Sequence, residues 1–203
     1  GSITGSITNS GEINTLNVTG NVNNGITHTA GNIANLTIDK GVNLGSGITN
    51  NAAIGNFTNN ANIAYSGSGS ITGNFSNAKD STITLNNNNL ILNGKDNTFN
   101  NNGTLKGTIS NIGTLASFTN TGSITGLESG NITGLLSNRD TGIIDNLVVN
   151  GNVSQMQNDG NIKDAIIKSE ITNGIINGDS NYKQATIGKL DIQASLGSNG
   201  LQN

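Results

Sequence analysis

Apolar residues recur along the chain in a short repeated pattern. A small residue is followed two positions later by Ile, Val or Leu, and a second apolar residue comes three positions after that, as in 11–18 (GEINTLNV) and 31–38 (GNIANLTI). The last two apolar residues of each unit alternate with a polar one, and this period of two with β-branched residues is typical of β-strands. Because neighbouring units lie about ten residues apart, the pattern predicts short strands in a repeat protein.

The bulkiest apolar residues define a longer period, twice that of the short unit. They form a column with nearly even spacing, and all four Phe of the chain belong to it. The column consists of Leu16, Leu36, Phe57, Phe75, Phe99, Phe118, Leu136, Met156 and Ile176. We therefore predict coils of about 20 residues, two units each, with these side chains stacked on one wall of the core. Coils of three units, about 30 residues each, are the competing interpretation and would scatter the Phe side chains over different walls.

A second apolar column shows the same irregularities in its spacing. Its members are Leu85, Ile109, Leu127, Leu147, Ile167 and Ile187. Both columns lengthen between Leu85 and Phe99 and shorten between Phe118 and Leu127. We therefore expect extra residues to bulge from the rod in or near 86–89, and a short turn at the second place.

These features predict an all-β fold, a single-stranded parallel β-helix (β-solenoid) of about ten coils forming one continuous domain over residues 1–203. Coils stacked at about 4.8 Å pair their backbones with the coil on either side and bury an apolar rod. Gly and Asn tolerate the backbone conformations of tight corners, and stacked Asn side chains can form amide ladders. Neither end resembles a protective cap, so we expect the sequence to be an excerpt of a longer protein.

The composition narrows the classes of function. The chain has 29 Gly, 40 Asn, no Pro, no Cys, one His and a single Arg, and only 10% of its residues are charged, with a net charge of −3. The lack of a basic surface argues against binding to nucleic acid, and the scarcity of His and Cys argues against a metal site. No apolar run approaches the ~20 residues of a membrane-spanning helix. We expect no cofactor, no nucleic-acid partner and no membrane span in this segment.

The repeated sequence pattern seen in 121–127 (TGSITGL) and 150–153 (NGNV) resembles that of the passenger domains of bacterial type V autotransporters. It is also similar to the exoproteins of two-partner secretion, of the filamentous-haemagglutinin type. The resemblance covers nearly the whole chain as a style of repeat. It implies a right-handed parallel β-helix, an extracellular or cell-surface location after secretion through the outer membrane, and a role in adhesion, aggregation or toxicity.

Parallel β-helices also include polysaccharide-degrading enzymes, whose sites need convergent carboxylates. Asp145 and Asp164 fall about one coil apart, with Arg139 close by in the sequence. We favour the alternative that these residues belong to a solvated outer wall with interspersed charges. Few aromatic residues remain outside the Phe column to serve as platforms for sugar rings.

Other candidate sites find less support in the sequence. His28 has no His or Cys partner and is expected at the surface, and the chain contains no Gly-Gly pair, which calcium-binding nonapeptide repeats require. Triplets of the Thr-x-Thr type, which would suggest ice binding, occur at 27–29 and 82–84 but do not recur at the coil spacing.

The predicted function is therefore that of a non-enzymatic adhesin and stalk, without catalytic, cofactor or metal residues. Its partners would be a host-cell surface, a glycan or other cells of the same kind, contacted through many weak polar interactions. The alternatives are the scaffold of a secreted toxin-like passenger and, third, a polysaccharide-degrading enzyme.

Overall fold

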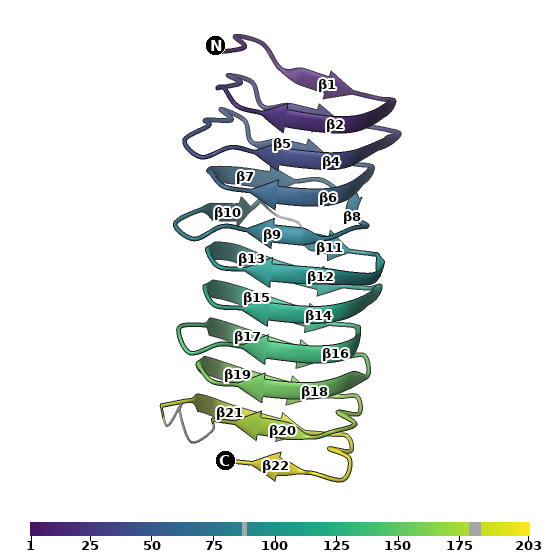
Figure 1. Ribbon diagram of the computed structural model, residues 1–203, viewed down its shortest axis with the longest axis vertical. Helices are drawn as coiled ribbons and strands as arrows, with labels where there is room; N and C mark the ends of the chain where they lie inside the picture. Colours follow the sequence, from purple (N-terminus) through teal and green to yellow (C-terminus); the bar gives the residue numbers. More distant parts are fainter. Residues whose placement is uncertain (87–88, 179–183) are drawn as a thin grey trace.

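The chain winds as a right-handed parallel β-solenoid in the computed structural model, which describes residues 1–86, 89–178 and 184–203 (Figure 1). Strands in front run from right to left, strands behind run from left to right, and the chain descends from one end of the rod to the other. Within the described ranges the fold is all-β, and no helix there is long and apolar enough to cross a membrane.

Each coil contributes one strand to a front wall and one to a rear wall. Side chains alternate along each strand, so both walls turn their apolar residues toward the interior. The front wall consists of β2 (Glu12–Val18), β4 (Asn32–Ile38), β6 (Ala53–Asn59), β9 (Phe75–Asn77), β12 (Lys95–Asn101), β14 (Thr114–Asn120), β16 (Asn131–Asn138), β18 (Val153–Asn158), β20 (Ile175–Asn177) and β22 (Leu201–Gln202). The rear wall consists of β1 (Ile7–Asn9), β3 (Ile26–His28), β5 (Ile48–Asn50), β7 (Asn62–Ser66), β10 (Thr82–Leu85), β13 (Thr104–Asn111), β15 (Ser123–Ser129), β17 (Ile143–Val149), β19 (Asn161–Ile167) and β21 (Thr186–Ile192). Two short strands, β8 (Ser70–Ile71) and β11 (Leu90–Leu92), lie where the rear wall turns into the front wall.

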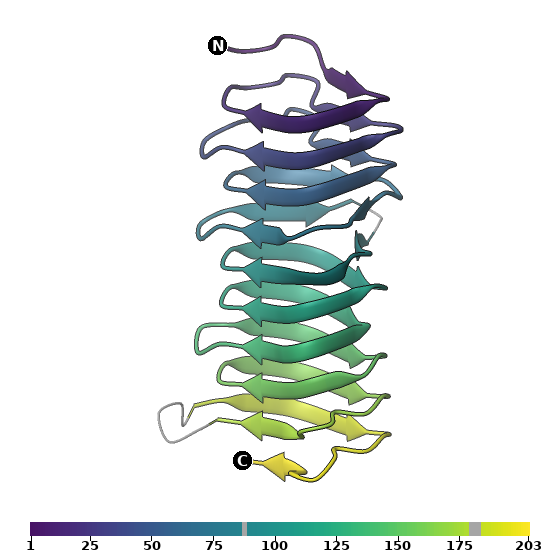
Figure 2. The same ribbon diagram turned by 45° about the vertical axis from the view of Figure 1, so that its right-hand side comes forward.

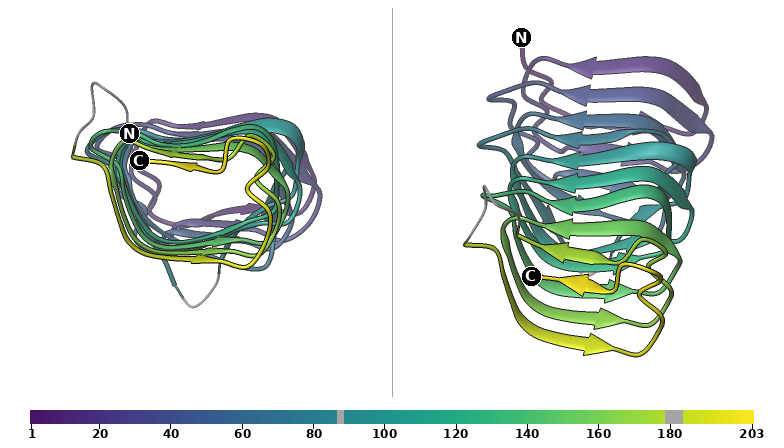
Figure 3. Two further views of the ribbon diagram at one scale, coloured as in Figure 1. Left: turned by 90° about the horizontal axis from the view of Figure 1, so that it is seen from below. Right: turned by 60° about the horizontal axis from the view of Figure 1, so that its bottom comes forward.

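Seen along the rod axis, the coils superimpose on one oblong outline with two long walls and two narrow edges (Figure 3). The turned view in Figure 2 shows the two ends of the chain at opposite ends of the rod. The interior is filled by inward-facing Ile, Leu, Val and Phe side chains that form one continuous core. Where the strands pair without a bulge, this arrangement aligns the outward residues of a wall in rows parallel to the axis.

The predicted column of bulky residues lies on the front wall. Direct backbone pairing joins, in order, Leu16, Leu36, Phe57, Phe75, Phe99, Phe118, Leu136 and Met156. The rings of Phe75, Phe99 and Phe118 are stacked with centroids 4.7 and 4.4 Å apart, and Phe57 meets Phe75 edge-on at 5.7 Å. The coil of two units is confirmed and the alternative of three units is excluded.

The last member of the predicted column is wrong. Met156 pairs with Ile175, whereas Ile176 points to the outer side of the same strand. The coil from Met156 to Ile175 is one residue shorter than the preceding coil from Leu136 to Met156. Because side chains alternate across a strand, an error of one residue moves a side chain to the opposite face.

The second predicted column is correct only over its central part. Ile109, Leu127 and Leu147 do pair in successive coils. The column continues above with Leu90 and below with Ala165 and Leu190. The other predicted members pair elsewhere: Leu85 with Tyr65, Ile167 with Val149, and Ile187 with Ile162. Small differences in corner length again account for these shifts.

The extra residues of the longest coil are divided between two corners. The chain takes six steps from Thr84 to Leu90 but three between their partners Lys106 and Ile109, so an insertion lies between β10 and β11, as predicted. Asn87 and Asn88, part of the predicted bulge at 86–89, lie outside the described residues. The opposite corner is also longer, with five steps from Asn77 to Thr82 where the next coil takes three from 101 to 104.

A column of Asn runs along the end of the front strands, buried from Asn59 to Asn158, half-buried at Asn177 and exposed at Asn203. Each Asn lies two positions after a member of the Phe column, and its Nδ2 donates to the Oδ1 of the Asn in the next coil at 2.6–2.9 Å. This amide ladder consists of Asn59, Asn77, Asn101, Asn120, Asn138, Asn158, Asn177 and Asn203. Its amides also donate to corner carbonyls, as Asn120 does to Gly122. A Cβ on Gly122 would lie 1.9 Å from the carbonyl oxygen of Gly103, so the stacked corner requires Gly there.

The N-terminal coils place their polar column at the opposite corner, at the ends of the rear strands. The Nδ2 of Asn9 donates to Nδ1 of His28 at 3.1 Å, and the Nε2–H of His28 donates to the carbonyl of Ala53 at 2.9 Å. His28 is completely buried, so its predicted surface position is wrong. The signal was present in the sequence, because Ile26-Thr27-His28 pairs in register with the Ile-Thr-Asn triplets at 7–9 and 48–50.

Candidate functional site

Beyond the first residues of its strands, where Glu12, Lys95 and Asp96 lie, the outer face of the front wall is an array of uncharged side chains. Two outward residues of each strand flank the inward Phe column, and neighbouring coils align them into two rows. One row contains Thr15, Asn35, Asn56, Asn74, Thr98, Ser117, Leu135 and Gln155, and the other contains Asn17, Thr37, Thr58, Ser76, Asn100, Thr119, Ser137, Gln157 and Ile176. We refer to these two rows as the neutral face. It offers hydroxyl and amide groups and no charged group, but Leu135 and Ile176 are apolar members and Ser137 is buried.

Hydrogen bonds between coils hold part of the neutral face in place. The Nδ2 of Asn56 donates to Oδ1 of Asn35 at 2.8 Å, and Oδ1 of Asn56 accepts the backbone N–H of Asn74 at 2.9 Å. The Oδ1 of Asn74 in turn accepts the backbone N–H of Thr98 at 2.9 Å. Side chains that are already ordered lose less conformational entropy when they meet a partner, which favours their use in recognition.

The rear wall has a different outer surface. Its lower strands carry charges of both signs, contributed by Lys106, Glu128, Asp145, Lys163, Asp164, Lys189 and Asp191. Asp164 pairs directly with Lys189 in the next coil, and Asp145 stands opposite Lys163. Opposite charges at neighbouring positions of a solvated sheet surface contribute little to stability, about 0–1 kcal/mol for each pair.

Asp145, Asp164 and Arg139 were the residues that could have suggested an enzyme. The two carboxylates do not lie directly opposite each other in neighbouring coils. The register between β17 and β19 places Asp145 opposite Lys163, while Asp164 pairs with Asn146. Arg139 lies in the turn after β16, where its backbone N–H donates to Asn120 and its carbonyl accepts from Gly142. The structure therefore places the two carboxylates on the charged part of the rear wall and Arg139 at the edge of the rod.

A row of hydroxyl groups on the upper rear wall was missed in the sequence. Thr8, Thr27 and Thr49 pair in successive coils, and Thr49 Oγ1 lies 3.2 Å from Ser66 Oγ. Triplets of the Thr-x-Thr type did not indicate this row, because each hydroxyl residue stands between an Ile and a buried polar residue. The repeated Ile-Thr-Asn and Ile-Thr-His triplets were the informative pattern.

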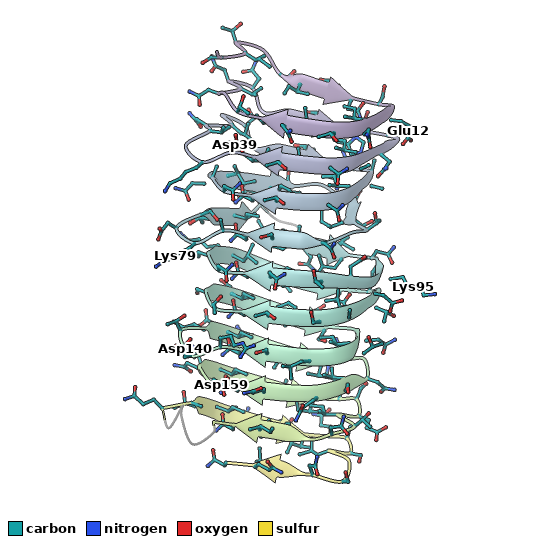
Figure 4. All side chains as sticks on the ribbon, in the orientation of Figure 1. Glu12, Asp39, Lys79, Lys95, Asp140 and Asp159 are labelled. Carbon is teal, nitrogen blue, oxygen red and sulfur yellow. The ribbon has the colours of Figure 1, made fainter. Side chains whose placement is uncertain are left out.

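Of the charged side chains labelled in Figure 4, Lys79 and Asp140 project from one narrow edge of the rod and Glu12 and Lys95 from the other, whereas Asp159 is buried. At the first edge, the longer connections at 39–47 and 78–81 flank the short connection at 60–61. Between them lies a recess of about 400 Å³ lined by Lys40, Lys79 and Asp80 together with uncharged residues. This recess mixes both signs of charge.

A second groove lies at the start of the front wall, next to the neutral face. It has a volume of about 440 Å³ and is lined by Thr114, Asn131, Ile132, Thr133, Asn152, Val153, Ser154 and Thr172. In contrast to the recess, it has no charged lining residue.

Tyr65 is the buried titratable group whose environment changes its acidity most clearly. Burial raises the pKa of the Tyr65 phenol to about 12, and the hydrogen bond that the Nδ2 of Asn50 donates to its Oη at 3.0 Å opposes this rise. The phenol packs beside Phe57 with ring centroids 6.2 Å apart. Its position in the core indicates a structural role.

In residues 1–86, 89–178 and 184–203 no group of three or more His, Cys, Asp or Glu side chains is arranged to hold a metal ion. Among known proteins, no family model, no curated protein and no solved structure matches this chain. The repeat architecture and the surfaces described above are therefore the basis for any functional proposal.

Proposed function

We propose that the chain is a non-enzymatic segment of a secreted or surface-exposed bacterial protein, a stalk whose neutral face acts as an adhesive surface. The observation that carries this proposal is the recurrence of uncharged hydroxyl and amide side chains, coil after coil, on a flat wall. Repetition of weak contacts along one rigid rod raises the overall affinity without any single deep pocket.

The class of protein proposed is a passenger domain of type V secretion. The right-handed parallel coils and the absence of Pro and Cys from the sequence support it, together with the resemblance in repeat style. A chain without Cys needs no disulfide chemistry to fold after export. The proposed partner is a cell surface or a glycan on it, met by many polar contacts.

Binding of the purified rod to immobilised glycans and to bacterial and host cells tests this proposal. We expect binding without cleavage of any glycan. The double variant Thr58→Lys/Thr119→Lys places two ammonium groups on the neutral face and should reduce binding, whereas the matched variant Thr27→Lys/Thr49→Lys on the rear wall should retain it. Equal effects of both variants would contradict the role of the neutral face, and glycan cleavage would replace the adhesin by an enzyme.

A further inference from the structure

The groove at the start of the front wall runs along the rod axis, because successive coils each contribute part of its lining. Thr114 pairs with Asn131, Ile132 pairs with Val153, and Val153 is bridged to Ile171, which precedes the lining residue Thr172. With coils about 4.8 Å apart, the lining extends over roughly 14 Å. Its shape suits an elongated ligand lying parallel to the axis.

Several polar groups that line this groove are uncommitted. In the part of the chain that the structure describes, the hydroxyls of Thr114 and Thr172 and the side-chain amide of Asn152 make no hydrogen bond with the protein. Asn131 is held in place, because its Oδ1 accepts the backbone N–H of Asn152 at 2.9 Å while its Nδ2 stays available. Ile132 and Val153 also line the groove, but their side chains turn into the core and are buried, so polar side chains form its accessible surface.

The backbone of the groove is already paired, and this excludes recognition by addition of a strand. The N–H of Ile132 donates to Asn152, the N–H of Val153 to Glu170, and the N–H of Thr172 to Val153. A peptide binding by β-augmentation needs free backbone groups at a sheet edge. Recognition in this groove must therefore use side-chain hydroxyls and amides.

The absence of charge from the lining favours a neutral ligand. Phosphate, sulfate and carboxylate groups are recognised through Arg, Lys or helix N-termini, and cationic ligands through carboxylates or aromatic faces, none of which lines this groove. A neutral sugar chain offers many hydroxyls that can donate hydrogen bonds to these side chains and accept them. We infer that this groove binds an uncharged oligosaccharide, an inference that rests on the proposed adhesive function and names its ligand class.

Chemical-shift changes of backbone and side-chain amides on titration with oligosaccharides test the inference. The probes are the neutral hexamers of β-1,4-linked glucose, β-1,4-linked N-acetylglucosamine and α-1,4-linked glucose, with an oligogalacturonate as the anionic comparison. We expect at least one neutral hexamer to shift the resonances of Asn131, Asn152 and Thr172 at low-millimolar concentration, and the anionic probe to leave them unchanged.

The double variant Asn152→Ala/Thr172→Val should abolish these shifts, whereas Thr119→Val on the neutral face should leave them intact. No shift with any neutral hexamer, shifts located elsewhere, or shifts caused by the anionic probe would overturn the inference.

The two proposals fail separately. If the groove variant binds cells as the wild type does while Thr58→Lys/Thr119→Lys does not, the groove inference is wrong and the adhesive neutral face stands. If neither variant affects cell binding although the hexamer shifts are present, the groove stands and the adhesive face does not.

Discussion

The upper and lower coils of the rod bury their polar groups at opposite corners. Above, the polar corner lies at the ends of the rear strands, with Asn9, His28 and Asn50, and the ends of the front strands carry Val18 and Ile38. Below, the front strands end in the amide ladder, and most of the rear strands end in apolar residues such as Val149 and Ile167. The buried polar groups change from the rear-strand corner to the front-strand corner near Asn50 and Asn59.

This difference shows that the repeat unit has two interchangeable endings. A unit that ends in Asn satisfies its buried amide only if the neighbouring coils end in a polar residue at the same corner, because an isolated buried amide would cost about 1–3 kcal/mol. A unit that ends in Val or Ile has no such requirement. The lower ladder meets the condition with identical side chains, whereas the upper corner combines Asn, His and Tyr side chains and a backbone carbonyl. The lower half should therefore be the more sensitive to substitution.

The largest effect is expected for Asn120→Asp in the middle of the ladder. A carboxylate cannot donate to the Oδ1 of Asn138, and it would place a charge at a completely buried position. We expect a loss of about 3–5 kcal/mol in the free energy of unfolding at pH 7, measured by urea denaturation. The matched control Asn56→Asp changes an exposed amide on the neutral face and should cost less than about 1 kcal/mol. Equal losses at both positions would show that the buried ladder is not continuous in solution.

Tyr65 gives the upper corner a dependence on alkaline pH. Its folded-state pKa of about 12 lies above the usual value near 10, so the contribution to stability is complete below pH 10 and is lost as the pH rises from 10 to 12. The loss should amount to roughly 2–3 kcal/mol. Urea denaturation of the wild type and of Tyr65→Phe over this pH range isolates the effect, because ionisation of the Lys residues is common to both proteins. Parallel pH profiles would contradict the buried, neutral phenol.

The exchange of corners can be tested by extending the ladder upward. Ile38→Asn places an amide directly above Asn59, where it can join the ladder, whereas Ile167→Asn places one between Val149 and Ile192. Both wild-type residues are Ile and completely buried, so the loss of apolar contacts is similar. The Ile38 variant should be the more stable of the two by about 1–3 kcal/mol in the free energy of unfolding. The opposite order would mean that neighbouring amides do not compensate one another.

The smallest effect is expected for His28→Asn. The new side chain would stand in register between Asn9 and Asn50 and would convert the mixed column to the all-Asn type. Loss of the bond to Ala53 and gain of new amide contacts should nearly cancel, leaving a change within about 1 kcal/mol in a thermal or urea denaturation experiment. The reverse exchange, Asn120→His, should be much more disruptive, because its corner is filled by amides on both sides. Equal tolerance of the two exchanges would remove the distinction between the corners.

The fold and its period could be predicted from the sequence because bulky apolar residues mark the core directly. Phe57, Phe75, Phe99 and Phe118 belong to one column in both sequence and structure. The errors arose where corners differ by one residue. A shift of that size exchanges the inner and outer faces of a strand, as it did for Ile176. In the same way, the residue that lies opposite Asp145 in the next coil is Lys163 and not Asp164.

The surfaces were less accessible to prediction, because a polar residue gives no direct indication of whether it turns inward. Asn59 and Asn56 are the same residue type in one strand, yet the first is completely buried in the ladder and the second is exposed on the neutral face. The groove beside Thr114 and Thr172 joins residues from different coils, and only the exact register of those coils brings them together.

The most direct test of the stacked ladder is solution NMR of the Asn side-chain amides. In the structure the Nδ2 groups of Asn101, Asn120 and Asn138 are buried and bonded to the next coil, whereas those of Asn56 and Asn146 lie on exposed residues. After transfer to deuterated water, the side-chain amide protons of the buried group should exchange far more slowly than those of the exposed group. Scalar couplings should also connect successive ladder amides across their hydrogen bonds. Equally rapid exchange in both groups, without such couplings, would contradict the buried amide ladder and the coil register on which it depends.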